Sequence, residues 1–289
     1  MARCAAVITR SAQSYARSAT APAARLARVG RENAAMVGVT GAAGVVDVRA
    51  ALADVAGFNE FFRVDTNPAE AVDPTWRPLS DLYTDPGPLA ARIAHVARVL
   101  GGDGGPVDDR IAASITLQGM AARVLSAPLA VVILHDVLPA FTARDVHWRV
   151  SATGPWPLWV GDPGVLAGPG LGEAELAGRL ADLLVEEHLA PLVEAVRAQV
   201  RVSARTLWGN AASSVAAGKR LVGLDRPAAA ARAARIAQVV LDHPALAATG
   251  ERRAAVAPDV GWTFRRRSCC LYYRAPGGGT CGDCVLAAR

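Results

Sequence analysis

Residues 173–196 read EAELAGRLADLLVEEHLAPLVEAV, and this stretch sets the fold class. Its apolar side chains recur every three or four positions, the spacing that places them on one face of an α-helix. They are Leu176, Leu180, Leu183, Leu184, Leu189, Leu192, Val193 and Val196. Pro191 lies within the pattern and predicts a kink, because proline lacks the N–H of the helical hydrogen bond. The stretch predicts a long helix that buries one face in a core.

Further elements are predicted on both sides of this helix. Residues 89–100 carry apolar side chains at helical spacing, and GGDGGP at 101–106 ends that segment. A helix is predicted over 110–125, which Pro128 ends or kinks, and two more over 203–218 and 225–243, the last with Asp225 as its N-cap. Residues 145–160 alternate apolar and polar side chains around a Gly-Pro turn, which predicts a β-hairpin.

These patterns predict an α+β fold that is mostly helical with a small antiparallel sheet. We expect an α+β body over residues 35–260 and a separate C-terminal segment over 261–289. Residues 1–34 are basic, and their first acidic residue is Glu32. We interpret them as a disordered N-terminal tail or as the product of an upstream start codon; an organellar transit peptide has a similar composition.

Composition excludes several classes of protein. The chain is 52% hydrophobic, enough for a sizeable core, and its net charge is only +5. Basic and acidic residues are interspersed, so no nucleic-acid partner is predicted. The longest apolar stretch, 124–134, is far shorter than the roughly 20 residues that span a bilayer. No transmembrane segment is therefore predicted, although peripheral membrane contact stays open. With no secretory signal, we expect a cytoplasmic protein whose thiols stay reduced.

Four of the five cysteines lie close together near the C-terminus. Cys269 and Cys270 are adjacent, ten residues separate them from Cys281, and two more separate Cys281 from Cys284. A disulfide framework is unexpected in the cytoplasm, so four thiolates indicate a zinc site or a two-iron, two-sulfur cluster. Adjacent side chains diverge, which favours the larger cluster without excluding zinc. Cys4 is isolated and is expected to be idle.

The CC-x10-C-x2-C spacing resembles the C-terminal signature of FhuF-like ferric-siderophore reductases. Residues 205–215, RTLWGNAASSV, are similar to a helix of that family, and so are residues 188–196, HLAPLVEAV. The resemblance implies a [2Fe-2S] cluster on Cys269, Cys270, Cys281 and Cys284. The C-terminal segment would then be an iron-sulfur-binding tail. It also implies one-electron reduction of Fe(III) in hydroxamate-type siderophores, in the cytoplasm.

The remaining candidate residues surround this motif. Arg265, Arg266, Arg267 and Arg274 would favour the reduced cluster, and Arg266 and Arg274 are candidates for contact with the substrate or an electron donor; the alternative is a solvated strand face. Asn210 is expected to cap a helix or to bind the tail, and Trp208 to lie in the core. His188 and Glu187 are adjacent on a helix and so are not expected to share a metal ion.

Two other functions compete with the reductase. The first is a zinc-binding interaction protein without enzymatic activity. The second is a siderophore-biosynthesis enzyme, which would need an ATP site that the sequence does not show. The sequence also has no glycine-rich phosphate loop between a strand and a helix. We therefore expect no bound NAD or flavin, and a separate electron donor such as a ferredoxin or a flavin reductase.

Overall fold

The computed structural model describes residues 47–151, 154–168 and 170–287, so the predicted tail over 1–34 and Cys4 lie outside the described residues. The helical elements are α3 (Val48–Val55), α4 (Leu79–Thr84), α5 (Pro86–Gly101), α6 (Asp109–His135), α7 (Glu173–Asp182), η3 (Leu183–Leu189), α8 (Ala190–Gln199), α9 (Ala204–Asp225), α10 (Ala230–Asp242) and α11 (Pro244–Ala247). Short 3-10 turns are η1 (Pro68–Val72), η2 (Gly102–Gly104), η4 (Pro227–Ala229) and η5 (Tyr272–Arg274). The strands are β1 (Val64–Asp65), β2 (Arg77–Pro78), β3 (Leu138–Pro139), β4 (His147–Trp148), β5 (Leu158–Trp159), β6 (Val165–Ala167), β7 (Gly250–Ala254) and β8 (Trp262–Arg266).

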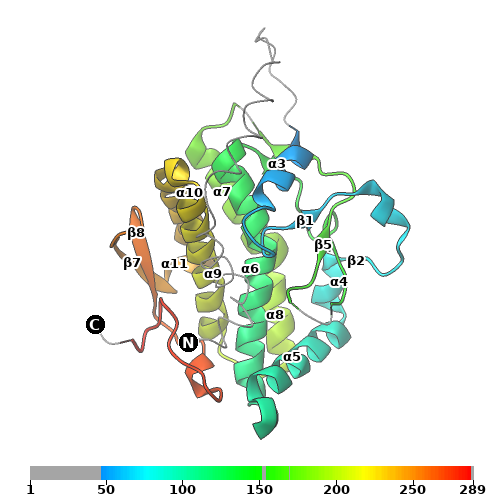
Figure 1. Ribbon diagram of the computed structural model, residues 1–289, viewed down its shortest axis with the longest axis vertical. Helices are drawn as coiled ribbons and strands as arrows, with labels where there is room; N and C mark the ends of the chain where they lie inside the picture. The colour runs from blue at the N-terminus through cyan, green and yellow to red at the C-terminus, as the bar shows by residue number, and fades with distance from the viewer. Residues whose placement is uncertain (1–46, 152–153, 169, 288–289) are drawn as a thin grey trace, which may run out of the picture.

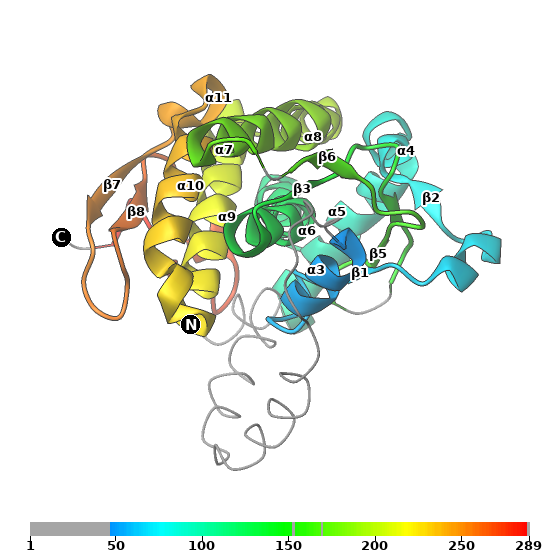
Figure 2. The same cartoon turned by 90° about the horizontal axis from the view of Figure 1, so that it is seen from above.

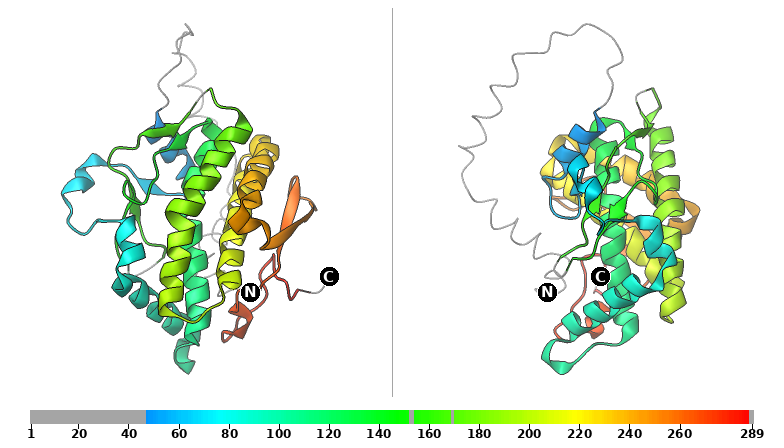
Figure 3. Two further views of the ribbon diagram at one scale, coloured as in Figure 1. Left: turned by 180° about the vertical axis from the view of Figure 1, so that it is seen from behind. Right: turned by 90° about the vertical axis from the view of Figure 1, so that its right-hand side faces the viewer.

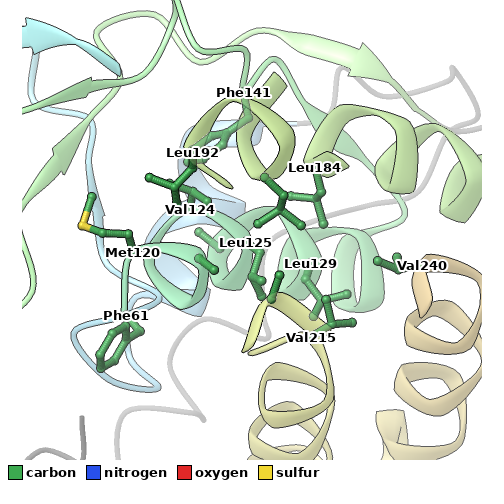
Figure 4. Packing of buried hydrophobic residues seen from close by; sticks show 14 of the residues in the cluster. Phe61, Met120, Val124, Leu125, Leu129, Phe141, Leu184, Leu192, Val215 and Val240 are labelled. Atoms are coloured by element: carbon green, nitrogen blue, oxygen red, sulfur yellow. The ribbon is translucent and has the colours of Figure 1, made fainter. Parts of the chain in front are cut away.

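Helix α6 runs through the middle of the molecule, with α9 and α10 on one side and β1, β2 and β5 on the other (Figure 1). Its most extensive packing is against α9. Figure 4 shows Leu125 and Leu129 of α6 between Leu184 and Val215, and all four side chains are fully buried. By length and mean hydropathy (1.7), α6 could cross a membrane, but 78% of its most apolar window is buried inside the fold. It is therefore buried like the core helix of a soluble protein.

The prediction that the helix ends at Pro128 is wrong, because α6 continues to His135. A proline inside a helix costs about 3 kcal/mol through its missing hydrogen bond and its ring. The turn beyond it buries Leu129, Val131 and Val132 completely, and each such side chain contributes roughly 1.5–3 kcal/mol. Burial on all sides of the helix thus outweighs the local penalty.

The predicted long helix is observed as α7, η3 and α8 in succession. The helix is irregular at the π-helical η3, which precedes the position of the predicted kink at Pro191. Pro191 lies in the first turn of α8, where its missing N–H costs little. His188 lies within η3 and is fully buried. Its ring nitrogens contact the Tyr83 hydroxyl (3.1 Å) and the Phe141 carbonyl oxygen (2.6 Å). Burial lowers the pKa of His188 to about 4, so this histidine is a neutral part of the core.

The described residues form three small sheets. The largest has the order β1-β5-β4-β2, in which β4–β5 is the predicted antiparallel hairpin and β1–β5 is a parallel pair. β3 pairs with β6, and β7 pairs with β8 from Gly250↔Arg266 to Ala254↔Trp262. The α+β prediction is therefore confirmed, with one parallel pair that the sequence did not indicate.

The β7–β8 hairpin and the C-terminal segment lie along the outer side of α9 and α10, remote from the β1-β5-β4-β2 sheet (Figures 2 and 3). Trp262 anchors β8, because its indole N–H donates to the Ala234 carbonyl oxygen of α10 at 3.0 Å. Lys219 of α9 is buried and donates to the carbonyl oxygens of Val260 and Trp262, both at 2.7 Å. These contacts fix the strand that leads into the cysteine-rich segment.

Candidate metal centre

The chain folds back between the two halves of the cysteine motif. Directly after Cys270, Leu271 adopts a left-handed backbone (φ 68°), and Gly277 does so in the glycine loop (φ 66°). At Gly278 a Cβ atom would lie 2.1 Å from a backbone oxygen, so only glycine fits this turn. The fold-back brings the Sγ atoms of Cys270 and Cys281 to 4.0 Å. One cysteine from each half of the motif therefore meets the other.

All four cysteines of the motif are free thiols, and hydrogen-bond donors surround them. Cys269 and Cys284 each accept a hydrogen bond from the backbone N–H two residues further along the chain, both at 3.3 Å. Cys281 accepts one from the Arg266 guanidinium at 3.2 Å. Donors of this kind stabilise thiolates and tune the potential of an iron-sulfur cluster.

The thiols of Cys270 and Cys281 lie within hydrogen-bond distance of each other. The pKa of Cys270 is lowered, first through its contact with Cys281 and further because the positive charge of Arg266 lies nearby. The pKa of Cys281 is raised, first through its contact with Cys270 and further by burial. A metal centre on both sulfurs would have to displace any proton that they carry.

Arg266 lies in the interior, so the structure does not place it where the sequence prediction needs it for contact with a substrate. The side chain is 1% exposed. Its guanidinium donates to the side-chain oxygen of Asn210 and to Cys281, and its Nε lies 3.6 Å from an Asp283 carboxylate oxygen. Burial works against the charge, but Asp283, Cys270 and Cys281 together raise the pKa of Arg266. We infer that Arg266 is a fixed positive charge beside the sulfurs.

Asn210 connects two central helices to the cysteine motif. Besides accepting from Arg266, its amide nitrogen donates to the backbone oxygen (2.7 Å) and the hydroxyl (2.8 Å) of Ser114 in α6. The Ser114 hydroxyl in turn donates to the Cys270 carbonyl oxygen at 2.8 Å. Asn210 is fully buried, and all of its side-chain atoms are used. The expectation that Asn210 binds the tail is thus confirmed.

The neighbours of Asn210 complete this contact. At Gly209 a Cβ atom would lie 2.2 Å from the Ser268 hydroxyl, so glycine lets the segment approach α9 closely. The Ser268 hydroxyl donates to the Arg205 carbonyl oxygen at 2.9 Å. Trp208 is half-buried and packs against the core, as predicted. The Leu-Trp-Gly-Asn sequence therefore acts as a docking surface for the cysteine-rich segment.

Asp283 is a site residue that the sequence analysis missed. It lies between Cys281 and Cys284, and its backbone oxygen accepts from the Arg266 N–H at 3.0 Å. Its carboxylate accepts a hydrogen bond from the Ser213 hydroxyl and faces Arg266. From the sequence alone, a negatively charged carboxylate next to thiolate ligands is expected to be repelled by them. The buried positive charge of Arg266 offsets this repulsion.

The other three arginines have different surroundings. Arg265 donates to the carbonyl oxygens of Val285 and Ala287 at 3.0 and 3.1 Å and so holds the chain end. Arg267 is exposed. Arg274 is also exposed and bonds to the Tyr273 hydroxyl at 3.0 Å, which leaves it accessible to a partner.

The donor set fits a [2Fe-2S] cluster better than one ion. Among the described residues, no three His, Cys, Asp or Glu side chains converge closely enough to hold a single metal ion. A closed zinc site needs four ligands around one point. The soft thiols and the N–H donors suit a cluster of net negative charge. So does Arg266, whose buried Nε has no hydrogen-bond partner within the described chain.

Comparison with known proteins gives one family match. Residues 266–286 match the model of the FhuF 2Fe-2S C-terminal domain. No curated protein matches the chain at a significant level. The match covers the cysteine motif and Arg266, and it confirms the predicted resemblance to FhuF-like proteins in this segment. The matched model describes a 2Fe-2S-binding domain, which supports a [2Fe-2S] cluster as the cofactor.

Proposed function

We propose that the protein is a ferric-siderophore reductase that releases iron in the cytoplasm. The observation that carries this proposal is the set of free, largely buried cysteines around Arg266, in a segment that matches a 2Fe-2S domain of the FhuF family. Cys269, Cys270, Cys281 and Cys284 would hold the cluster. When bound, the cluster would supply one electron at a time, at a potential set by the surrounding charges and hydrogen bonds.

The chain's own residues would hold and tune the centre. The N–H donors on the sulfurs and the fixed charge of Arg266 favour the form that carries the additional electron. Ser114 and Asn210 fix the backbone at Cys270, which limits movement of the ligands between redox states. Such rigidity keeps the rearrangement that accompanies electron transfer small.

The substrate's chemistry explains why one electron suffices. Hydroxamate oxygens are hard anionic ligands that hold Fe(III) much more strongly than Fe(II). When Fe(III) gains one electron it becomes Fe(II), the hydroxamates take up protons, and the metal dissociates. The electron would come from a separate donor of the ferredoxin or flavin-reductase type. Arg274, exposed at the edge of the segment, remains a candidate contact for that donor or for the chelate.

The test begins with protein purified without oxygen. We expect two iron and two sulfide per chain, visible absorption, and an EPR signal on one-electron reduction. A ferric trihydroxamate should then yield Fe(II), trapped by a coloured chelator, at a rate that is lost in Cys281→Ser. A colourless protein with one tightly bound zinc would contradict the reductase and favour the zinc-binding interaction protein.

A further inference from the structure

A cleft of about 460 Å³ lies beside the candidate metal centre. Small-molecule sites usually have volumes of about 300–1,000 Å³. Its walls come from α6, α9, β8, the β7–β8 connection and the loop between the last two cysteines. The lining includes Ala217, Arg220, Asp259, Trp262, Phe264 and Asp283.

The cleft touches the motif itself. Gly282 and Asp283 are the two residues between Cys281 and Cys284, so a molecule in the cleft would contact the loop that carries two of the proposed ligands. At Gly282 an added Cβ would meet nothing within 4 Å, so this face of the loop is open. Substrate iron bound here would lie next to the redox centre, as electron transfer requires.

The charged groups of the cleft balance one another. Lys219 donates hydrogen bonds to two backbone carbonyl oxygens, and the Arg220 Nε lies 2.8 Å from an Asp259 carboxylate oxygen. Asp283 is the second acidic residue of the lining. Two basic and two acidic side chains therefore give no net formal charge. With a negatively charged cluster behind the wall, the cleft would repel a highly anionic chelate and accept a neutral one.

The uncharged part of the lining combines the polar side chains of Gln118, Ser213 and Thr263 with apolar and aromatic ones. Trp262 uses its indole N–H on α10, and Phe264 follows it on the same face of β8, two residues along. Small residues of α9, Ala216 and Ala217, form the opposite wall. Such a surface suits the methylene chains that link the metal-binding groups of a multidentate chelator.

We propose that this cleft is the binding site for the iron chelate and that it selects an uncharged trihydroxamate over a trianionic triscatecholate. The inference rests on the proposed function and adds to it the place of binding and the basis of selectivity. A trihydroxamate of a trivalent metal is neutral, because three hydroxamate anions balance the metal.

Binding without electron transfer tests the site. Gallium(III) has the charge of Fe(III) but no accessible lower oxidation state, so gallium trihydroxamate is the probe, measured by calorimetry on the holo-protein. Ala217 is exposed on α9, so Ala217→Leu and Ala217→Trp should fill the cleft while the helix and the cluster spectrum persist. We expect binding to weaken in that order, by tenfold or more for tryptophan.

Ala231→Trp is the matched control, because Ala231 is also exposed on a helix, α10, but lies outside the cleft lining. It should bind the probe like the parent protein. If Ala217→Trp also binds the probe like the parent protein, this cleft is not the binding site. If the parent protein itself neither binds the probe nor reduces the ferric chelate, the proposed function is contradicted. If Ala217→Trp binds the probe normally and is impaired only in its reduction by an electron donor, the cleft serves the donor and the proposed chelate site is refuted.

Asp259→Asn tests the charge argument. It removes one negative charge from the lining, so the preference for gallium trihydroxamate over gallium triscatecholate should fall several-fold. The change should shrink as salt rises, because Arg220 and Asp259 are partly exposed. A triscatecholate that binds the parent protein more tightly than the trihydroxamate would refute the proposed selectivity.

Discussion

Replacing Arg266 by glutamine should lower the reduction potential of the holo-protein. The guanidinium lies 3.2 Å from the Cys281 sulfur and its side chain is fully buried. A unit charge at about 4 Å in an effective dielectric of about 20 is worth about 4 kcal/mol. The added electron is spread beyond this sulfur, and Asp283 offsets part of the charge of Arg266. We therefore take half of this interaction energy, roughly 2 kcal/mol. At about 59 mV for each tenfold change, this corresponds to a fall of roughly 90 mV.

The assay is a redox titration followed by visible absorption, with Arg274→Gln as the matched control. Arg274 is exposed, so its loss should change the potential much less, and that change should disappear at high salt. Arg266→Lys keeps the charge but not the forked hydrogen bonds, and should recover most of the potential. Equal shifts in the two glutamine variants, or an unchanged potential in Arg266→Gln, would refute the assignment of Arg266 as the charge that tunes the centre.

Three more outcomes follow from the same contacts. Serine at any of the four clustered cysteines should lose or destabilise the cluster, because a hard oxygen replaces a soft thiolate, whereas Cys4→Ser should keep full iron and sulfide content. Removal of the metal should loosen the segment after Gly261 and leave the helical circular dichroism nearly unchanged, since the core of α6, α9 and α10 is built without it; loss of the whole helical signal would contradict this modularity. The folded apo-protein should lose stability as pH falls from about 6.5 towards 4, because the unfolded state then protonates His188 and the folded state does not; the loss is roughly 3 kcal/mol, and His188→Gln should abolish most of it in urea titrations.

The helical pattern alone allowed much of the body to be predicted. The stripe over 173–196 and the alternation over 145–160 both correspond to observed elements, whereas the predicted boundary between α9 and α10 is wrong, because α9 continues past Gly218 to Asp225 and α10 begins at Ala230. Local rules failed at Pro128, where burial on every side of α6 outweighs a lost hydrogen bond. They could not indicate the parallel β1–β5 pair either, because two-residue strands carry too little pattern.

The candidate site was predictable only in part. Spacing indicates the four cysteines as ligands, because ligand chemistry requires those residue types close together. The sequence could not show that Arg266 points inward while Arg274 points outward, since both follow the same basic composition. The roles of Asp283 and Ser114 depend on hydrogen-bond partners far away along the chain, Ser213 at 70 residues and Cys270 at 156 residues. The cleft likewise joins α9 to β8 and to the C-terminal loop, which no local pattern could place side by side.

A single-turnover experiment separates the proposed reductase from its alternatives. The holo-protein is reduced by one electron, freed from reductant, and mixed in a stopped-flow instrument with a ferric trihydroxamate and an Fe(II) trap. We predict that the oxidised visible spectrum returns as one Fe(II) is trapped for each cluster. A protein that stays reduced while the chelate keeps its iron, or one that never contained a cluster, would contradict it.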